Sequence, residues 1–233
     1  MADQFHESKN YLFHKMKRKI IVTNDGSNSL FVEELGETYH SRHGAVQESI
    51  HVYIKNGLSL IEKTEIDVLE FGFGTGLNAL LTEEYAEKNN LKICYETVEA
   101  FPLEKEEYEL LNYGALIKTS IPFNQFHEIP WNKSQRLTER FSIIKHHKTI
   151  ELFSTEKKFD IIYFDVFGYD FQPELWSKDI FQKAYNYLKP NGLLVTYACK
   201  GIVNKTLKGL GFEIHKLAGP PGKREMTLAV KKM

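Results

Sequence analysis

An apolar run in this chain ends in three alternating glycines, within LEFGFGTGLN at residues 69–78. Glycine has no Cβ, so its backbone turns sharply and approaches a ligand more closely than that of any other residue. A strand followed directly by such a turn and a helix is typical of ligand-binding loops in helix-covered sheets. Gly72, Gly74 and Gly76 therefore constrain both the fold and the position of a binding site.

The segments around this turn alternate between strand and helix patterns. Short apolar runs predict strands at residues 66–71, 91–99, 141–147, 159–165 and 192–198. Helix signals predict helices at about 78–89, 102–113, 173–188 and 202–211. This alternation predicts an α/β fold, a mostly parallel sheet with helices on both faces. The last two strands, at 212–217 and 226–232, are close enough in sequence to pair antiparallel.

The residues before this alternation follow a different pattern. The stretch KIIVTNDGSNSLFVEEL, from Lys19 onward, predicts two strands joined by an Asn-Asp-Gly turn. Val46, Ile50 and Tyr53 then share one face of a predicted helix. We therefore expect residues 1–63 to form an N-terminal extension, a β-hairpin plus a helix, packed on a core domain of residues 64–233.

Composition limits the class of protein. A chain of 233 residues is long enough for one sizeable core, and 42% hydrophobic with 26% charged residues is typical of soluble globular proteins. There is no run of 18 apolar residues, and MADQFHESKN at the start lacks the apolar core of a secretion signal. Cys94 and Cys199 lie in strand-like runs. A cytoplasmic location with reduced thiols is expected.

Charge is distributed unevenly although the net charge is only −1. Residues 189–233 contain nine Lys or Arg and two Asp or Glu, whereas residues 83–109 contain nine Glu and three Lys. A basic region of this kind can bind a polyanion while the total charge stays near zero. The same distribution also fits ordinary solvated surfaces, so charge alone does not decide between these interpretations.

The spacing of the glycines favours one cofactor class over another. A dinucleotide fingerprint needs glycine or alanine three places after the second glycine, where this chain has Leu77. The pattern suits instead the loop of S-adenosylmethionine enzymes, which lies under the amino-acid part of that cofactor. Glu99 ends the next predicted strand, 23 residues after Gly76, near the spacing expected for an acid that binds ribose hydroxyls. The alternative is that Glu99 is only a polar strand end.

Two further acids flank the ends of predicted strands. Glu70, just before the glycines, accepts hydrogen bonds either from the cofactor amino group or, equally, from backbone amides as a capping acid. Asp165 ends the strand at 159–165 and is followed by aromatic residues and a proline in DVFGYDFQP. An acid in this loop, facing the methyl group, usually marks a nitrogen methyltransferase. The aromatic residues alternatively only cover the end of the sheet.

At these motifs the chain resembles the tRNA 5-methylaminomethyl-2-thiouridine-forming methyltransferases. The family pattern ExGFGTGLN is matched from Glu70 to Asn78, and its ending KREM is matched from Lys223 to Met226. Its FDxxFxDxFxPxxNPxxW is matched at residues 159, 160, 165, 167, 173 and 176, and its early YFSxxxGLEE only loosely, so the resemblance covers about residues 25–230. In many bacteria this methyltransferase is fused to an FAD-dependent oxidase, of which nothing is found here. The resemblance therefore implies a stand-alone methyltransferase.

The resemblance implies a class I, Rossmann-like methyltransferase fold with a seven-stranded sheet. It implies methyl transfer from S-adenosyl-L-methionine to the primary amine of 5-aminomethyl-2-thiouridine at the wobble position of tRNA, with the anticodon loop as partner and no metal. Asp165 is the expected catalytic residue. The expected cofactor-binding residues are Glu70, Gly72, Phe73, Gly74, Thr75, Gly76, Asn78, Glu99 and Asp165. The expected substrate-binding residues are Phe167, Pro173, Lys223 and Arg224, the last two as phosphate contacts or as part of a solvated loop.

The chain departs from the family pattern at two places. Tyr169 and Gln172 replace a proline and an asparagine in the loop after Asp165. The acid that usually faces the adenine amino group is replaced by His147 and Lys148, so a backbone carbonyl or the Thr149 hydroxyl is expected to serve there.

Two other functions stay open on the sequence alone. The same sheet carries small-molecule methyltransferases and aminopropyl transferases, although a basic C-terminal region does not suit a small free amine. A non-catalytic nucleoside-binding module is the alternative of another class, and it leaves Asp165 without a role.

Overall fold

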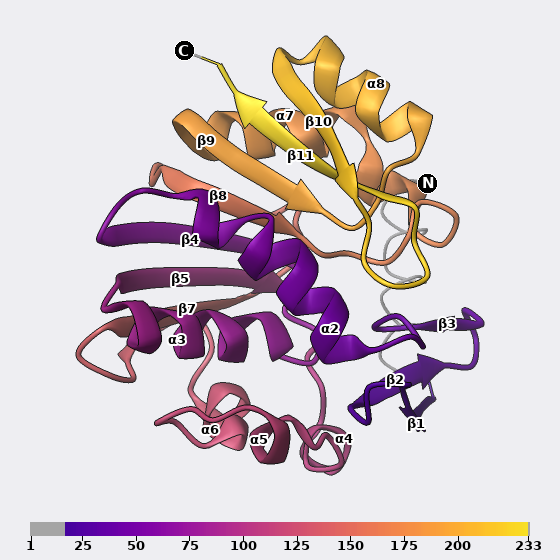
Figure 1. Ribbon diagram of the computed structural model, residues 1–233, viewed down its shortest axis with the longest axis vertical. Helices are drawn as coiled ribbons and strands as arrows, with labels where there is room; N and C mark the ends of the chain where they lie inside the picture. Colours follow the sequence, from indigo (N-terminus) through magenta and orange to yellow (C-terminus); the bar gives the residue numbers. More distant parts are fainter. Residues whose placement is uncertain (1–16, 233) are drawn as a thin grey trace.

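The computed structural model of the protein describes residues 17–232 and has one large mixed sheet with a small sheet beside it (Figure 1). The eight strands of the large sheet lie in the order β10-β11-β9-β8-β4-β5-β7-β6. The five central strands are parallel to one another. Their bounds are β4 (Glu65–Phe71), β5 (Lys92–Glu99), β7 (Phe141–His147), β8 (Phe159–Phe164) and β9 (Leu188–Thr196).

Antiparallel strands complete both edges of this sheet. At one edge the hairpin β10 (Phe212–Ala218) and β11 (Glu225–Lys231) pairs through β11 with β9, which confirms the expected antiparallel pair. At the other edge the short strand β6 (Ser134–Arg136) pairs with β7. The prediction of seven strands was therefore one too low. A three-residue strand with no alternation of buried and exposed positions gives too weak a pattern to be recognised in sequence.

Helices cover the two faces of the sheet, as predicted. The first face carries α2 (Ala45–Ser49), the π-helix η1 (Ile50–Lys55), α3 (Leu77–Asn89) and α6 (Phe123–Glu128). The second carries α7 (Lys178–Tyr187) and α8 (Gly201–Gly209). Alternate strand residues serve the two cores: Val68 and Ile161 face the first, whereas Leu69 and Ile162 face the second. This double burial explains why the central strands read as continuous apolar runs.

The predicted helix at 102–113 is wrong in length. Only α4 (Lys105–Tyr108) is helical there, followed by α5 (Tyr113–Leu116). Leu111 and Tyr113 are both buried. On a continuous helix, residues two positions apart point about 200° apart around the axis, so one helix could not bury both on the same face. The chain therefore breaks between α4 and α5 to bury both side chains. Two short 3-10 helices, η2 (Leu58–Leu60) and η3 (Pro173–Trp176), complete the helical segments among residues 17–232.

The N-terminal region forms the small sheet. Strands β1 (Arg18–Val22) and β2 (Asn28–Val32) pair around the Asn-Asp-Gly turn as predicted, and β3 (Glu37–Thr38) adds to β2. Figure 1 shows this sheet near the carboxyl ends of the central strands, close to the loop that joins β10 and β11. The extension is therefore positioned to contribute to any site at that end of the large sheet.

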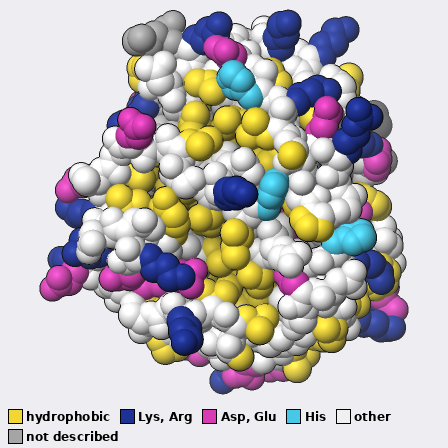
Figure 2. Space-filling view, in the orientation of Figure 1, with side chains coloured by type: hydrophobic (Ala, Val, Ile, Leu, Met, Phe, Trp, Pro, Cys, Tyr) yellow, Lys and Arg dark blue, Asp and Glu magenta, His cyan; other side chains and the backbone are white. Residues whose placement is uncertain are grey.

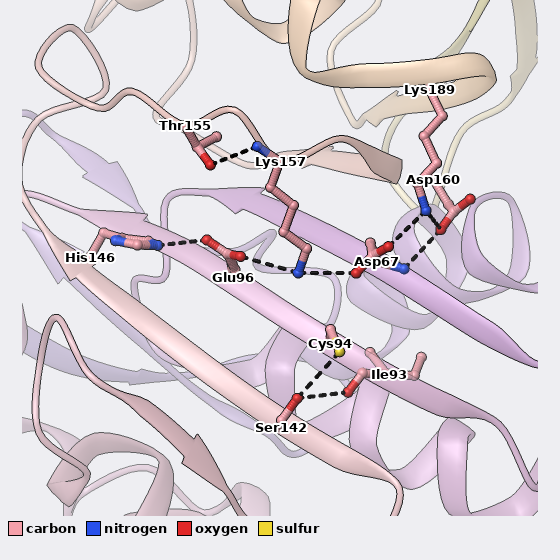
Figure 3. A network of polar contacts seen from close by, with 10 residues as sticks. All are labelled: Asp67, Ile93, Cys94, Glu96, Ser142, His146, Thr155, Lys157, Asp160 and Lys189. Atoms are coloured by element: carbon pink, nitrogen blue, oxygen red, sulfur yellow. Dashed lines mark hydrogen bonds and ion pairs between the residues drawn. The ribbon is translucent and has the colours of Figure 1, made fainter.

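A charged network lies on the second face of the sheet, across β4, β5 and β7 (Figure 3). His146 and Glu96 are 2.8 Å apart, and the Lys157 ammonium contacts Glu96 at 3.2 Å and Asp67 at 3.0 Å. Lys189 extends the network, with its ammonium 2.7 Å from Asp67. Burial opposes the charge of Glu96, but the contacts of His146 and Lys157 hold its pKa below the ordinary value. His146 is thus engaged on this face, away from the glycine turn.

No helix within residues 17–232 has the length and apolar character needed to cross a membrane.

Candidate active site

A cavity of about 780 Å³ opens at the carboxyl ends of the central strands. It lies where the chain order of the strands reverses between β4 and β8, the usual ligand position in open α/β sheets. Its walls come from the small sheet and α2, from the loops after β4, β5, β7, β8 and β9, and from the β10–β11 loop. The predicted site residues that reach its wall are Gly72, Gly74, Glu99, Asp165, Phe167, Lys223 and Arg224.

The glycine turn brings backbone to the cavity where side chains would not fit. Gly72 has φ +93°, and a Cβ on it would lie 2.3 Å from the carbonyl oxygen of Asp165. The amide of Asp165 in turn donates to the Phe71 carbonyl at 2.9 Å, so the ends of β4 and β8 are in close contact. Gly74 has φ +48° and faces the ring of Tyr39. Both conformations favour glycine, and together they leave an open cradle along the turn.

Glu99 lies beside this turn and is bonded to it. One carboxylate oxygen accepts from the Gly74 amide at 3.0 Å, and the other accepts from the Phe101 amide at 2.8 Å. Each oxygen has two acceptor sites, so each retains capacity for one hydroxyl donor. The carboxylate is therefore fixed with its remaining acceptor capacity at the cavity wall, which fits a pair of ribose hydroxyls.

The segment after β7 provides an unpaired polar group. Thr149 lines the cavity, and its buried hydroxyl has no hydrogen-bond partner among the described residues. Lys148 also lines the cavity, whereas His147 is exposed and packs its ring against Trp131 at 5.5 Å. A buried hydroxyl without a partner costs free energy unless a ligand satisfies it. Thr149 and Lys148 thus line the cavity on this side, whereas His147 does not.

Glu70 and Asp165 share one donor behind the cavity. The side-chain amide nitrogen of Asn78 lies 3.0 Å from Glu70 and 2.7 Å from Asp165. Glu70 is fully buried and also accepts from the Thr97 hydroxyl at 2.8 Å. Burial, with the nearby Asp165 carboxylate, raises the pKa of Glu70 to about 8. Glu70 and Asn78 do not reach the cavity wall, so their structural part is to hold Asp165.

Asp165 itself is partly exposed to the cavity at the end of β8. Burial raises its pKa to about 6, and the nearby Glu48 carboxylate adds to that rise. The buried hydroxyl of Tyr53 lies beside Asp165, and its interaction with the carboxylate limits this rise in pKa. With a pKa near 6, the carboxylate of Asp165 is charged at neutral pH, and it can accept hydrogen bonds from a group in the cavity.

Three predicted cofactor residues belong to the turn but do not line the cavity. Phe73 is 97% buried and packs edge-on against His127 with ring centroids 5.2 Å apart. The Thr75 hydroxyl is 2.7 Å from a ring nitrogen of His40, and Gly76 is the residue before α3. These residues fix the shape of the turn, and any cofactor contact they make is through neighbouring backbone. Their assignment as binding residues stays a prediction.

The predicted substrate residues divide into two groups. Phe167 lines the cavity and packs edge-on against Tyr39 with ring centroids 5.0 Å apart. Pro173 is exposed and starts η3 beside the cavity without lining it. Arg224 is exposed at the rim. The Lys223 ammonium, by contrast, lies 2.6 Å from Glu48, so its engagement is inside the cavity.

Glu48 and Tyr197 are cavity residues that the sequence did not single out. Glu48 is on α2, and Tyr197 follows β9 with its ring 3.8 Å from the Lys223 ammonium. A carboxylate in a short helix and a tyrosine next to an apolar strand are both ordinary in sequence. Only the loose match at Glu48 to the early family pattern gave any signal.

The family profile described as "S-adenosyl-L-methionine-dependent methyltransferase" matches residues 117–232. The glycine cradle, the fixed Glu99 carboxylate and the unpaired Thr149 hydroxyl fit a nucleoside cofactor with an amino-acid tail. The predicted methyltransferase class and its S-adenosylmethionine cofactor are thus confirmed. Among residues 17–232 no group of three or more metal-ligating side chains is present.

The sequence relatives are more specific. The chain is 30% identical over 212 residues to the tRNA 5-methylaminomethyl-2-thiouridine biosynthesis bifunctional protein MnmC of Leptospira interrogans, covering 84% of this chain and 33% of the relative. The MnmC of Cupriavidus metallidurans is 27% identical over 225 residues, which are 90% of this chain and 33% of the relative. The chain is thus similar to these MnmC proteins, as predicted, and spans about a third of their length.

Solved structures support the fold. MNMC2 from Aquifex aeolicus aligns with a TM-score of 0.75 and 24% identity, over 100% of this chain and 78% of that chain. Spermidine synthase from Thermotoga maritima aligns with a TM-score of 0.53 and 14% identity, over 93% of this chain and 74% of that chain. These similarities confirm the methyltransferase-type fold.

Proposed function

We propose that this protein transfers a methyl group from S-adenosylmethionine to the primary amine of 5-aminomethyl-2-thiouridine, or its unthiolated form, at the wobble position of tRNA. The observation that carries the proposal is Asp165, a carboxylate held at the end of β8 between the glycine turn and the open part of the cavity. The names of the MnmC relatives, which include tRNA 5-methylaminomethyl-2-thiouridine biosynthesis, support the substrate.

The cofactor, when bound, supplies a methyl carbon attached to a positively charged sulfur. The cradle of Gly72 and Gly74 and the carboxylate of Glu99 would hold it, with Thr149 at the purine end. These residues place the reactive end of the cavity beside Asp165, which lies against Gly72. The arrangement leaves the space between Asp165, Phe167 and Tyr197 for an unstacked uridine.

Asp165 would orient the amine. A primary amine attacks only through a free lone pair, and an alkyl amine is mostly protonated at neutral pH. Asp165 accepts a hydrogen bond from one N–H and thereby aims the lone pair, a contribution of positioning. A carboxylate alone raises the pKa of a bound amine, so Asp165 serves mainly for orientation and secondarily for accepting a proton.

The tRNA backbone would contact exposed basic residues at the rim. Arg224 is exposed beside the cavity, and it is the residue of its loop that we assign to phosphate. Figure 2 shows several Lys and Arg side chains over the α8 end of the face viewed there. The Lys223 ammonium pairs with Glu48, so Arg224 and not Lys223 is the principal phosphate contact of this proposal. Such an enzyme would act in the cytoplasm, where tRNA is modified.

The proposal is tested with purified protein and tRNA that contains the aminomethyl nucleoside. Nucleoside mass spectrometry should show conversion to the methylaminomethyl form with one equivalent of cofactor consumed. The same incubation with putrescine or small primary amines tests the alternative of a small-molecule transferase. Methylation of the small amines at a comparable rate, with none on tRNA, would reject the proposal. Cofactor binding without transfer to either substrate class would favour a non-catalytic nucleoside-binding module.

A further inference from the structure

A primary ammonium already occupies the wall of the cavity beside Asp165. The Lys223 ammonium lies 2.6 Å from Glu48 and 3.8 Å from the centre of the Tyr197 ring. Lys223 comes from the β10–β11 loop, Glu48 from α2 and Tyr197 from the end of β9, so three distant segments converge here. All three line the same cavity as Asp165.

The pair is oriented with its cation toward the cavity. The Glu48 side chain is 8% exposed and also accepts from the Ser41 amide at 2.7 Å, whereas the Lys223 side chain is 33% exposed. The Tyr197 hydroxyl donates to the Val166 carbonyl at 2.8 Å, next to Asp165, which fixes the ring on which the ammonium lies. Glu48 therefore anchors Lys223, whose ammonium is the more exposed partner of the pair.

We propose that Lys223, anchored by Glu48 and Tyr197, is the positioning residue that keeps the substrate amine in its neutral, nucleophilic form. This inference rests on the proposed function and deepens it. Asp165 alone would favour the protonated amine, which cannot react. A fixed cation beside the same site opposes protonation, because a like charge disfavours the charged form of an amine.

The chemical step then balances without a further base. The substrate ammonium releases one proton to water when it enters the site. The neutral nitrogen uses its lone pair to form the bond to the methyl carbon, and the carbon–sulfur bond breaks with its electron pair on sulfur. The cofactor becomes a neutral thioether, and the product is a secondary ammonium that carries the charge. Repulsion from Lys223 then favours loss of that proton or departure of the product.

Several other titratable groups lie around Lys223. His40 on the chain before α2 is buried, and burial lowers its pKa to about 4. Tyr53 on η1 is buried and Tyr197 after β9 is half-buried, and desolvation raises both pKa values well above the ordinary one. Burial raises the pKa of Asp165 to about 6. The remaining charged or titratable neighbours are His43, which contacts the Gly222 turn position, and Arg224 and Glu225 along the loop. Glu70 titrates near pH 8 behind Asn78, equally in every variant compared below.

The test compares Lys223→Met, which removes the charge at similar volume, with Lys223→Arg, which keeps it. Single-turnover methylation of aminomethyl-uridine tRNA is followed from pH 6.5 to 9.5 at saturating enzyme. We expect the half-maximal pH of the Met variant to move upward by about one unit, a roughly tenfold loss at pH 7 that is recovered at high pH. The Arg variant should keep the wild-type profile. A structural defect would lower the rate at every pH instead.

A second measurement needs no chemistry. Calorimetric binding of the 5-aminomethyluridine nucleoside at pH 7.5, in buffers with different ionisation enthalpies, gives the number of protons released. The wild type and the Arg variant should release close to one proton per nucleoside, and the Met variant distinctly less.

Two results would overturn the inference: superimposable pH profiles for the Met variant and the wild type, or equal proton release. A wild-type protein that methylates tRNA with either result retains the proposed function and loses only the role of Lys223. A wild-type protein that leaves the aminomethyl tRNA unmodified at every pH rejects the proposed function itself.

Discussion

Asn78 and Asp165 are joined by a 2.7 Å hydrogen bond between the first turn of α3 and the end of β8. The same amide nitrogen donates at 3.0 Å to Glu70, so one side chain holds two carboxyl groups of raised pKa. Asn78 belongs to the stretch that follows the glycines, and its side chain therefore links the cofactor turn to the proposed catalytic carboxylate. Loss of this link should disturb the position of Asp165 more than the fold.

The first prediction concerns the charge of Asp165. Asp165→Asn keeps the shape of the side chain and one acceptor while removing the charge. We expect single-turnover methylation to fall by about 10²-fold or more, the range of a lost acid–base or orienting group. Cofactor affinity, measured by calorimetry, should change little. Near-normal turnover would show that Asp165 is structural and would direct attention to Tyr169 and Asp170 in the same loop.

The structure also shows what sequence patterns reveal and what they do not. The glycine turn and Asp165 could be placed from sequence because each directly follows a buried apolar strand. In a parallel sheet the carboxyl ends of such strands meet at the same edge. Glu48 and Tyr197 were not, because they reach the cavity only through packing between segments far apart in the chain. The break between α4 and α5 likewise depends on burying Leu111 and Tyr113 together, which local helix propensity does not encode.

The outcome for Lys223 follows from the same limit. The charge count of residues 189–233 correctly marks a basic region, but a count contains no information on direction. The side chain points inward because its ammonium pairs with the buried Glu48 carboxylate on α2, about 175 residues earlier in the sequence. Arg224, one position later, points outward and is exposed.

The second prediction is a pH dependence of stability. Burial raises the pKa of Glu70 to about 8, so the folded state binds this proton more tightly than the unfolded state. Stability from this group is present at low pH and is lost as pH rises from the ordinary value of about 4.3 toward 8. Glu70→Gln should remove that loss. Relative to the wild type, the variant should gain at most about 1.4 kcal/mol per pH unit across this interval.

Urea unfolding at pH 5 and pH 8 measures this difference. A stability difference between Glu70→Gln and the wild type that is the same at both pH values would mean that Glu70 is ionised throughout. Glu84→Gln is the control, because this residue lies on α3 and pairs with Lys88 at the surface.

The third prediction concerns the cradle. A methyl group on Gly72 would meet the Asp165 carbonyl oxygen at 2.3 Å in a backbone with φ +93°. Gly72→Ala should therefore cost about 1–3 kcal/mol in unfolding free energy from backbone strain, with a further loss in activity because β8 must shift. Gly201→Ala is the matched control, since no atom lies within 4 Å of its added Cβ. Thermal unfolding of both variants gives the comparison, and equal melting temperatures would reject the close contact.

The fourth prediction concerns cofactor binding by Glu99. Both of its oxygens accept backbone hydrogen bonds, and both retain capacity for ribose hydroxyls. Glu99→Ala should weaken binding of S-adenosylmethionine by about 1–3 kcal/mol, the cost of leaving polar partners unpaired. NAD should not compete with the cofactor in the same calorimetric assay. Unchanged affinity in the Ala variant would show that the ribose lies elsewhere in the cavity.

The fifth prediction concerns the surface that meets tRNA. Arg224 is exposed at the rim of the cavity, within a basic C-terminal region. A single phosphate contact releases condensed counterions, so its loss lowers the dependence of affinity on salt by about one slope unit. Arg224→Ala should therefore weaken tRNA binding at low salt and flatten the plot of log Kd against log salt, with cofactor affinity unchanged.

Lys208→Ala is the matched control for Arg224→Ala. Lys208 is exposed on α8 in the same basic region and does not line the cavity. Its substitution by alanine therefore removes the same charge at another place. A direct contact predicts a slope change for Arg224→Ala that Lys208→Ala lacks. Equal effects of the two substitutions would mean that the region acts only through its total field. A wild-type slope in Arg224→Ala would place the tRNA on a different face of the molecule.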